Sequence, residues 1–124
     1  MIKIYGRDGC PMCKDAVEWL DLKEIPYQFR EIFREPLTQA ELSALAEKLP
    51  NRFYDLYAPK GARKVGLPEN ARELSPGKIV SLQQENPDLI RYPIFDLGDE
   101  LLFGFYDTTK SALLRNNPFT PFVE

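Results

Sequence analysis

The sequence has no histidine among its 124 residues. Without an imidazole, the chain cannot form a Cys–His or Ser–His–Asp catalytic centre, or a zinc site with a histidine ligand. It has only two cysteines, Cys10 and Cys13. Two are too few to fill a tetrahedral zinc site within one chain or to staple a small secreted domain. We therefore expect no metal, and we expect the two cysteines to act as a pair.

Long apolar runs and a large excess of one charge are missing as well. The sequence contains no stretch of about 18 apolar residues, which a membrane-spanning helix requires, and its N-terminal segment lacks the features of a signal peptide. The net charge is −3 with acidic and basic residues interspersed, so no basic stripe favours direct binding to nucleic acid. We expect a cytoplasmic monomer that binds neither membranes nor nucleic acid.

The composition and the first third of the chain predict an α/β domain. Of the residues, 44% are hydrophobic and 28% are charged, which is the balance of a soluble domain with its own core. Residues 2–5 and 27–32 have the composition of strands, and residues 12–23 place apolar side chains at helical spacing between them. A strand, a helix and a strand within about 30 residues form a βαβ unit, whose two strands are parallel.

The middle of the chain predicts helices. Thr38 and Glu41 match a capping box, in which each residue satisfies a backbone N–H of the other. Residues 51–73 contain prolines and glycines that suggest short helical turns joined by loops. Ser75-Pro76 combines an N-cap with a proline at the first helical position, which predicts a further helix.

The last part of the chain predicts a β-hairpin and a helix. Residues 93–96 and 101–103 are apolar runs separated by a glycine-containing turn. The predicted fold is α/β and thioredoxin-like, a four-stranded mixed sheet flanked by helices, with a helical insertion at about residues 38–88. We expect residues 1–115 to form a single domain and residues 116–124 to form a C-terminal tail.

The sequence Cys10-Pro11-Met12-Cys13 lies between the first predicted strand and the first predicted helix. The first N–H groups of a helix have no partner within it, and the helix dipole adds about half a positive charge there. A thiolate at this position is stabilised. We therefore expect Cys10 to be the exposed nucleophile and Cys13 to be the shielded resolving thiol. The alternatives are half of a metal site shared between chains, or an inert pair of small buried residues.

Tyr92-Pro93 directly precedes the first strand of the predicted hairpin. Thioredoxin-type folds place a cis-proline at this point, facing the cysteine pair. The order of elements therefore predicts a cis bond here, with a substrate chain hydrogen-bonded to the backbone of Tyr92. We expect Pro11 to contact the substrate too. Arg91 and Arg63 are candidates to bind a substrate anion, although a solvated loop would also explain the basic cluster that contains Arg63.

The chain resembles the arsenate reductase (ArsC)/Spx family of thioredoxin-like proteins over about residues 2–114. The matching segments are residues 5–13, Ile32-Phe33-Arg34-Glu35-Pro36-Leu37-Thr38 with Glu41-Leu42, and Asn86-Pro87-Asp88-Leu89-Ile90-Arg91-Tyr92-Pro93-Ile94. This resemblance implies a thioredoxin core with a helical insertion, as the pattern of elements also predicts.

The family's arsenate reductases carry three anion-binding arginines around a single catalytic cysteine. At the matching places this chain has Tyr92, Gly104 and the neighbourhood of Pro59, and Arg91 and Arg63 are the nearest arginines. A second cysteine one turn after the first fits an intramolecular disulfide better than exchange with external glutathione.

We therefore expect a glutaredoxin- or ArsC-like thiol–disulfide oxidoreductase that acts on a thiol or disulfide substrate. It would need no cofactor, because glutathione or a partner thiol protein would supply the reducing equivalents. One alternative is an Spx-like redox-switch regulator, which the resemblance implies would bind the C-terminal domain of the RNA polymerase α subunit. The other alternative is an arsenate reductase.

Overall fold

A computed structural model describes residues 1–115 of the chain. These residues fall into two compact units, one made of residues 1–31 and the chain from Tyr92 onward, the other of Ile32–Arg91. Each unit is described by itself. The predicted tail at 116–124 lies outside the described residues, and the prediction of a single domain stays a prediction.

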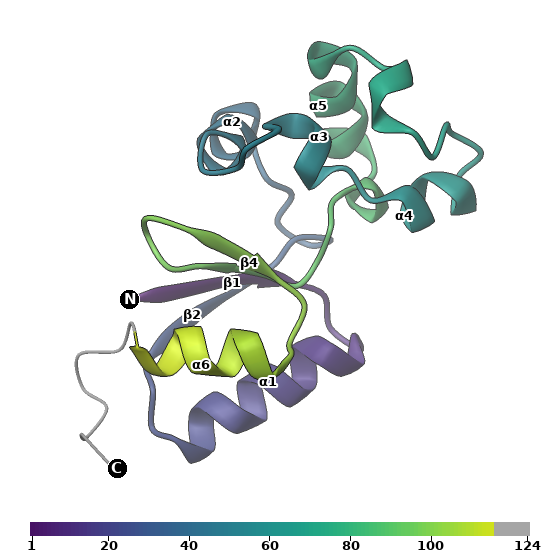
Figure 1. Ribbon diagram of the computed structural model, residues 1–124. Coiled ribbons are helices and arrows are strands. Elements are labelled where there is room, and N and C mark those ends of the chain that lie inside the picture. Colours follow the sequence, from purple (N-terminus) through teal and green to yellow (C-terminus); the bar gives the residue numbers. More distant parts are fainter. Residues whose placement is uncertain (116–124) are drawn as a thin grey trace. The chain divides into compact units, whose positions relative to one another are not determined.

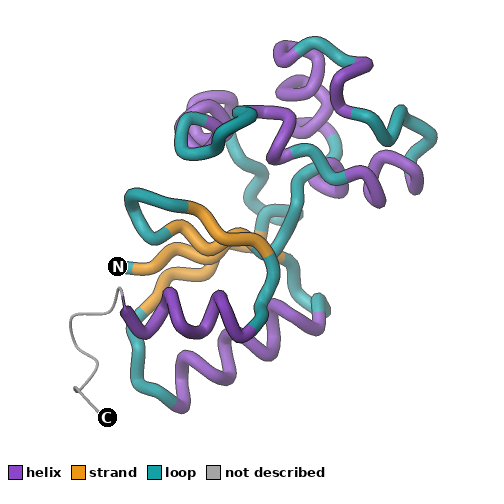
Figure 2. Tube along the Cα trace, viewed as in Figure 1, coloured by secondary structure: helices purple, strands orange, loops and turns teal. Residues whose placement is uncertain are grey.

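The first unit contains a four-stranded sheet with the strand order β2-β1-β3-β4 (Figures 1 and 2). Strand β1 (Ile2–Gly6) pairs in parallel with β2 (Tyr27–Glu31) and antiparallel with β3 (Ile94–Asp96). Strand β3 pairs antiparallel with β4 (Leu101–Phe103), which closes the hairpin. The predicted mixed sheet of four strands is thus confirmed.

Two helices of this unit, α1 (Pro11–Leu22) and α6 (Asp107–Arg115), lie on the same face of the sheet (Figure 1). The core between helices and sheet consists of small and branched side chains with one aromatic ring: Ile2, Ile4, Ala16, Leu20, Ile25, Phe95 and Leu113. Full burial of an isoleucine or leucine side chain stabilises a fold by about 1.5–3 kcal/mol. These residues therefore hold α1 firmly against β1.

The register between β1 and β2 decides which side chains face α1. Ile2 pairs with Tyr27, Ile4 with Phe29, and Gly6 with Glu31. Side chains two residues apart on a strand point to the same face, so Tyr27, Phe29 and Glu31 share the face on which Ile2 and Ile4 pack against the helix. The first two of these β2 residues are aromatic and the last is a carboxylate, at the end of the strand.

The second unit consists of helices and connecting turns. Its elements are α2 (Gln39–Ala46), α3 (Phe53–Leu56), α4 (Pro59–Lys64), α5 (Pro76–Glu85) and the 3-10 helices η1 (Ala71–Glu73) and η2 (Pro87–Leu89). They enclose a core of Tyr57, Ala62, Ile79 and Leu89. This unit is the predicted helical insertion.

Helices α2 and α5 begin where the sequence predicts. The Thr38 hydroxyl accepts a hydrogen bond of 3.1 Å from the backbone N–H of Glu41, and the Thr38 N–H donates one of 2.9 Å to the Glu41 carboxylate. The Ser75 hydroxyl caps α5 through the N–H of Lys78. Within residues 1–115, no helix has the length and apolar character needed to cross a membrane.

Candidate functional site

The loop between β1 and α1 positions the two cysteines. Gly9 has a φ of +84°, a left-handed conformation that glycine adopts without strain, and the N–H of Cys10 donates to the carbonyl of Arg7 at 3.2 Å. The chain then enters α1 with Cys10 at the N-cap and the exposed Pro11 at the first helical position. Proline suits that position because its missing N–H would have had no partner there.

The sulfur of Cys10 acts as the side-chain cap of α1. It accepts a hydrogen bond of 3.2 Å from the backbone N–H of Cys13, a role that a serine, threonine or aspartate oxygen fills in most helices. Cys10 is partly exposed, so the sulfur is open to reagents while the helix holds it. The N-cap position places this sulfur at the end of α1 where the first backbone N–H groups have no partner within the helix.

Cys13 lies in the first turn of α1 and is only 2% exposed. Burial and a hydrogen bond to the Cys10 side chain raise the pKa of the Cys13 thiol from 9.0 to about 12, although the backbone of Arg7 acts in the opposite direction. Cys13 is therefore a protonated thiol at neutral pH and donates its proton toward the Cys10 sulfur. This placement of an exposed and a buried sulfur is the predicted one, and the chemical roles stay predictions.

Gly6 provides the space in which the Cys13 sulfur sits. A β-carbon on Gly6 would lie 2.6 Å from Cys13 Sγ and 3.3 Å from the ring of Phe29. The sequence pattern does not single out this glycine. The available signal was its position two residues after Ile4, on the face of β1 that packs against α1.

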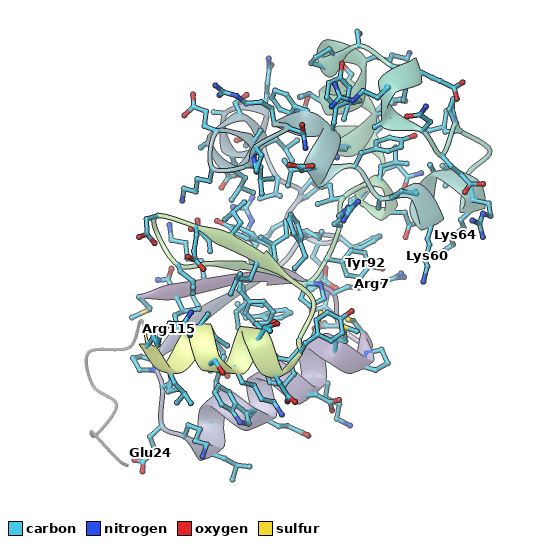
Figure 3. The ribbon with its side chains drawn as sticks, in the orientation of Figure 1. Arg7, Glu24, Lys60, Lys64, Tyr92 and Arg115 are labelled. Carbon is cyan, nitrogen blue, oxygen red and sulfur yellow. The ribbon has the colours of Figure 1, made fainter. Side chains whose placement is uncertain are left out.

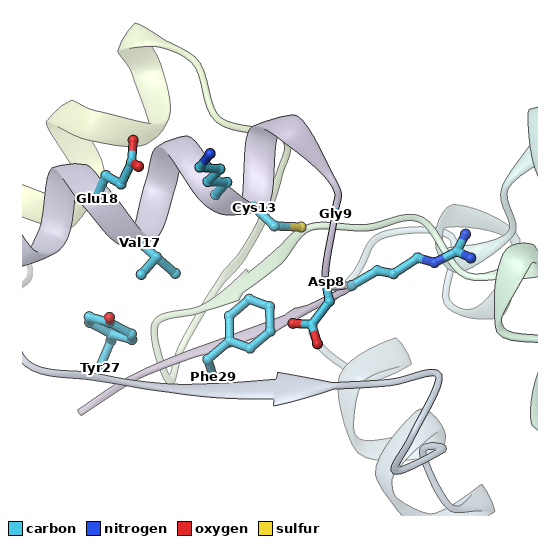
Figure 4. Close-up of a pocket in the computed structure, with 9 residues that line it drawn as sticks. Asp8, Gly9, Cys13, Val17, Glu18, Tyr27 and Phe29 are labelled. Carbon is cyan, nitrogen blue, oxygen red and sulfur yellow. The ribbon is translucent and has the colours of Figure 1, made fainter.

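A pocket of about 380 Å³ opens beside Cys13, between the cysteine loop, α1 and β2 (Figure 4). Val17, Tyr27 and Phe29 are large apolar side chains that line it. The other residues that line it are Arg7, Asp8, Gly9, Cys13, Lys14 and Glu18. The sequence does not indicate this pocket, because core packing explains an aromatic residue on a strand better than a binding surface does.

Glu31 lies at the end of β2, in register with Gly6. Its carboxylate accepts a hydrogen bond of 3.0 Å from the backbone N–H of Asp8, so its side chain reaches the cysteine loop. The negative charge of Glu31 also contributes to the raised pKa of Cys13. Sequence reasoning did not find this residue, since only the register between β1 and β2 brings it to the site.

The peptide bond between Tyr92 and Pro93 is cis, as predicted. Ile94 pairs with Tyr5 across β1 and β3, so Pro93 lies at the end of the sheet where β1 leads into the cysteine loop. Pro93 is buried and Tyr92 is partly exposed (Figure 3). Contact of Pro11, Tyr92 and Pro93 with a substrate stays a prediction.

The two candidate arginines lie in the second unit and have partners there. The exposed Arg63 guanidinium binds the Glu69 carboxylate through two hydrogen bonds, of 3.0 and 2.8 Å. This pairing raises the pKa of Arg63 and lowers that of Glu69. The Arg91 Nε donates to the carbonyl of Tyr57 at 3.1 Å. Both side chains thus hold the insertion together, and their binding of a substrate anion stays a prediction.

The rest of the basic cluster is solvent-exposed. Lys60 and Lys64 are exposed on α4 (Figure 3), and Lys64 Nζ lies 3.6 Å from the carboxylate of Asp88. No group of three or more cysteine, aspartate or glutamate side chains in the described part of the chain is placed to bind a metal ion.

Known proteins resemble this chain in sequence. A family model described as glutaredoxin matches residues 2–55. The global transcriptional regulator Spx of Enterococcus faecalis is 32% identical over 105 residues, covering 85% of this chain and 80% of that protein. The global transcriptional regulator Spx 2 of Lactococcus lactis is 27% identical over 114 residues, covering 92% and 86%.

Solved structures share the fold. The YffB (PA3664) protein aligns with a TM-score of 0.75 at 23% identity, covering 92% of this chain and 99% of that one. An arsenate reductase (ArsC) related protein from Brucella melitensis aligns with a TM-score of 0.67 at 25% identity, covering 90% and 92%. The arsenate reductase of Vibrio cholerae aligns with a TM-score of 0.69 at 18% identity, covering 92% and 95%.

Proposed function

Because this chain belongs to the ArsC/Spx family of thioredoxin-like proteins, we propose that it is a thiol–disulfide oxidoreductase that works through Cys10 and Cys13. One observation carries the proposal. The partly exposed Cys10 sulfur caps α1 and accepts the N–H of Cys13, while the buried Cys13 thiol donates to the same sulfur. Both contacts direct hydrogen-bond donors at the Cys10 sulfur, and a cysteine sulfur in its thiolate form is the nucleophile in disulfide exchange.

The reaction proceeds in two exchanges. The Cys10 thiolate attacks one sulfur of a substrate disulfide, which forms a mixed disulfide and releases the other substrate sulfur as a thiolate. Cys13, after losing its proton, attacks the Cys10 sulfur and releases the second substrate sulfur. The substrate thus gains two electrons and two protons, and the cysteine pair is oxidised to a disulfide. An external thiol, either glutathione or a partner protein, reduces the pair again.

Tyr92-Pro93 is the place that we propose for the substrate chain. Tyr92-Pro93 lies at the end of the sheet from which the cysteine loop departs. The backbone of Tyr92 would hydrogen-bond an extended substrate segment there, and the exposed Pro11 would contact the same segment. An extended segment held by backbone groups is compatible with many side chains, which suits a general disulfide substrate.

The proposal is tested by turnover and by trapping. The reduced protein, supplied with excess external thiol, should reduce a small disulfide catalytically, and Cys10→Ser should abolish this activity. Cys13→Ser should stop the reaction at the mixed disulfide, which mass spectrometry would show as a covalent adduct on Cys10. Equal behaviour of the two serine variants would contradict the roles assigned here, and absence of turnover in the unaltered protein would contradict the proposed activity.

A second candidate is a redox-switch regulator, because the curated relatives above are named as global transcriptional regulators. By resemblance, its partner would be the C-terminal domain of the RNA polymerase α subunit. This candidate predicts binding to that domain that differs between the dithiol and disulfide forms. A protein that binds the domain in one redox state and turns over no disulfide would support the regulator.

A further inference from the structure

The second exchange of the proposed reaction needs an acceptor for the Cys13 proton. In the reduced pair the Cys13 thiol donates to the Cys10 sulfur. Once Cys10 is part of a mixed disulfide, it carries no negative charge and cannot take that proton. Burial, the largest cause of the raised Cys13 pKa, persists in that intermediate. A free thiolate on Cys13 would therefore be rare at neutral pH, so unaided attack would be slow.

The amino-acid composition limits which side chains could accept the Cys13 proton. The chain has no histidine, so the most common proton acceptor in proteins is absent. Lysine and arginine side chains ordinarily carry a proton and a positive charge at neutral pH, so they are poor proton acceptors. A carboxylate is the remaining class of side chain that can take a proton from a thiol there.

The sheet register selects one carboxylate. Gly6 and Glu31 are paired across β1 and β2, and adjacent strands lie about 4.8 Å apart. The Cys13 sulfur packs directly over Gly6, where a β-carbon would otherwise be. Since paired residues of parallel strands project to the same face, the Glu31 side chain projects to the face of the sheet on which this sulfur lies. The hydrogen bond from Asp8 N–H to Glu31 Oε2 fixes the carboxylate at the cysteine loop.

We propose that Glu31 accepts the proton of Cys13 as Cys13 attacks the mixed disulfide. This inference rests on the proposed oxidoreductase function. The Cys13 S–H bond breaks, and its proton passes to a Glu31 oxygen, directly or through one water in the adjoining pocket. The Cys13 electron pair forms the bond to Cys10 Sγ, and the Cys10–substrate bond breaks with its electrons on the departing sulfur. That thiolate takes a proton from solvent, and Glu31 returns its own proton to solvent.

Other charged and titratable groups surround Cys13 and must be separated from Glu31. They are Cys10 at the helix N-cap, Arg7 and Asp8 of the loop, Lys14 and Glu18 of α1, and Tyr27 of β2. Asp8 is the alternative proton acceptor to exclude first. Its backbone N–H donates to the Glu31 carboxylate, so the two residues are neighbours. Among the carboxylates, Glu31 is the one whose negative charge contributes to the raised pKa of the Cys13 thiol.

The two exchanges can be timed separately. Reduced protein mixed with dithiobis(nitrobenzoate) in a stopped-flow spectrometer should release one equivalent of thionitrobenzoate when Cys10 attacks and a second when Cys13 resolves the adduct. Glu31→Gln retains an oxygen for the Asp8 N–H but loses the ability to accept a proton. The first phase should stay within about twofold of the unaltered protein, and the second should slow by about 100-fold, a typical value for general-base assistance.

Matched variants and the pH profile complete the test. Glu18→Gln removes one negative charge from an exposed position on α1, and Asp8→Asn removes the rival carboxylate; both should leave the second phase within about twofold. From about pH 6 to about pH 9 the second phase should be nearly independent of pH in the unaltered protein, but should rise about tenfold per pH unit in Glu31→Gln, where only the free thiolate reacts.

Each outcome decides one question. A second phase in Glu31→Gln that matches the unaltered protein overturns the assignment of Glu31, as does slowing confined to Asp8→Asn. If Glu31→Gln does not fold, a tenfold rise per pH unit in the unaltered protein would equally rule out carboxylate assistance. Failure of the oxidoreductase proposal itself looks different, because the unaltered protein would then release no second equivalent.

Discussion

The backbone of Gly6 and the sulfur of Cys13 are in close contact: a β-carbon on Gly6 would lie 2.6 Å from Cys13 Sγ. The two residues belong to β1 and α1, so this contact sets how closely the first turn of the helix approaches the sheet. The Cys13 sulfur is buried at this contact. The site therefore requires a glycine at position 6, because any residue with a β-carbon there would overlap the Cys13 sulfur.

Gly6→Ala should destabilise the fold and disturb the cysteine pair. The added methyl group overlaps the sulfur, so either Cys13 or the start of α1 must move, at a cost of about 1–3 kcal/mol in the free energy of unfolding. Urea denaturation followed by circular dichroism measures this change. Gly77→Ala is the matched control, because a β-carbon there meets no atom within 4 Å.

The control should move stability in the opposite direction. Gly77 is an exposed residue of α5, and replacing glycine by alanine in a helix stabilises it by up to about 1 kcal/mol. If Gly6→Ala were as stable as the unaltered protein, the close approach of Gly6 and Cys13 would not exist in solution.

Alkylation should distinguish the two cysteines. At neutral pH, iodoacetamide should modify Cys10 and leave Cys13 unmodified, because Cys13 is buried and its pKa is raised to about 12. In urea both thiols should react. Peptide mass spectrometry after short exposures measures each site, and modification of Cys13 as fast as Cys10 in the folded protein would contradict the arrangement described above.

The Cys13 thiol also makes the free energy of unfolding depend on pH in the alkaline range. Its pKa is 9.0 ordinarily and about 12 in the folded protein. Below about pH 9 the thiol is protonated in both states, and the stabilisation is fully present. As the pH rises toward 12, the unfolded chain ionises first and the free energy of unfolding falls. The urea midpoint should therefore drop over this interval.

A variant is needed to assign that drop. The pKa values of Tyr27 and Tyr57 are also raised by burial, and they lower stability at alkaline pH in the same direction. Cys13→Ala should lose part of the pH dependence while the tyrosine contribution remains. An identical alkaline decline in Cys13→Ala and the unaltered protein would show that the Cys13 pKa is not raised on folding.

Local sequence patterns accounted for much of the fold. The strand–helix junction at Cys10, the cap at Ser75 and the hairpin after Pro93 each depend on a few neighbouring residues, so they can be predicted from a short window. The cis bond at Pro93 followed from the order of elements. In each case the physical cause lies within the segment or within the topology that it implies.

The parts of the site that were missed depend on contacts between segments. Glu31 reaches the cysteine loop only because Gly6 pairs with it, and a shift of one residue would turn its side chain to the other face. Nor does sequence indicate that the Arg63 guanidinium is bound by Glu69, six positions later across a turn. Its charge and the family resemblance made Arg63 a candidate, whereas its partner Glu69 is visible only in three dimensions.

Thr38→Ala tests a feature that local sequence predicts, the capping box at the start of α2. The variant removes the hydroxyl that accepts the Glu41 N–H, and loss of such a cap costs about 1 kcal/mol. Ser43→Ala, within the same helix α2, is the control and should be neutral or slightly stabilising, since alanine is the better helix former. Equal urea midpoints for Thr38→Ala and the unaltered protein would show that the capping box is not needed for α2.

Gly104 bears on whether this protein could act as an arsenate reductase. The resemblance places an anion-binding arginine of that activity at this position. Here the backbone has a φ of +77°, and a β-carbon would overlap the ring of Tyr106. Gly104→Ala should therefore destabilise the fold by about 1–3 kcal/mol, from the left-handed backbone and from overpacking together. A glycine held in this way leaves no room for an arginine without moving the loop before α6.

A double-mutant cycle separates the two contributions at Gly104. In a Tyr106→Ala background the ring is gone, so Gly104→Ala should cost only the backbone part, about 1 kcal/mol. Because Tyr106 is 56% exposed, its own replacement should change stability little. Equal costs of Gly104→Ala in both backgrounds would mean that the ring does not restrict this position. An arsenate-dependent consumption of thiol that Cys10→Ser abolishes would show directly that the activity does not require an arginine there.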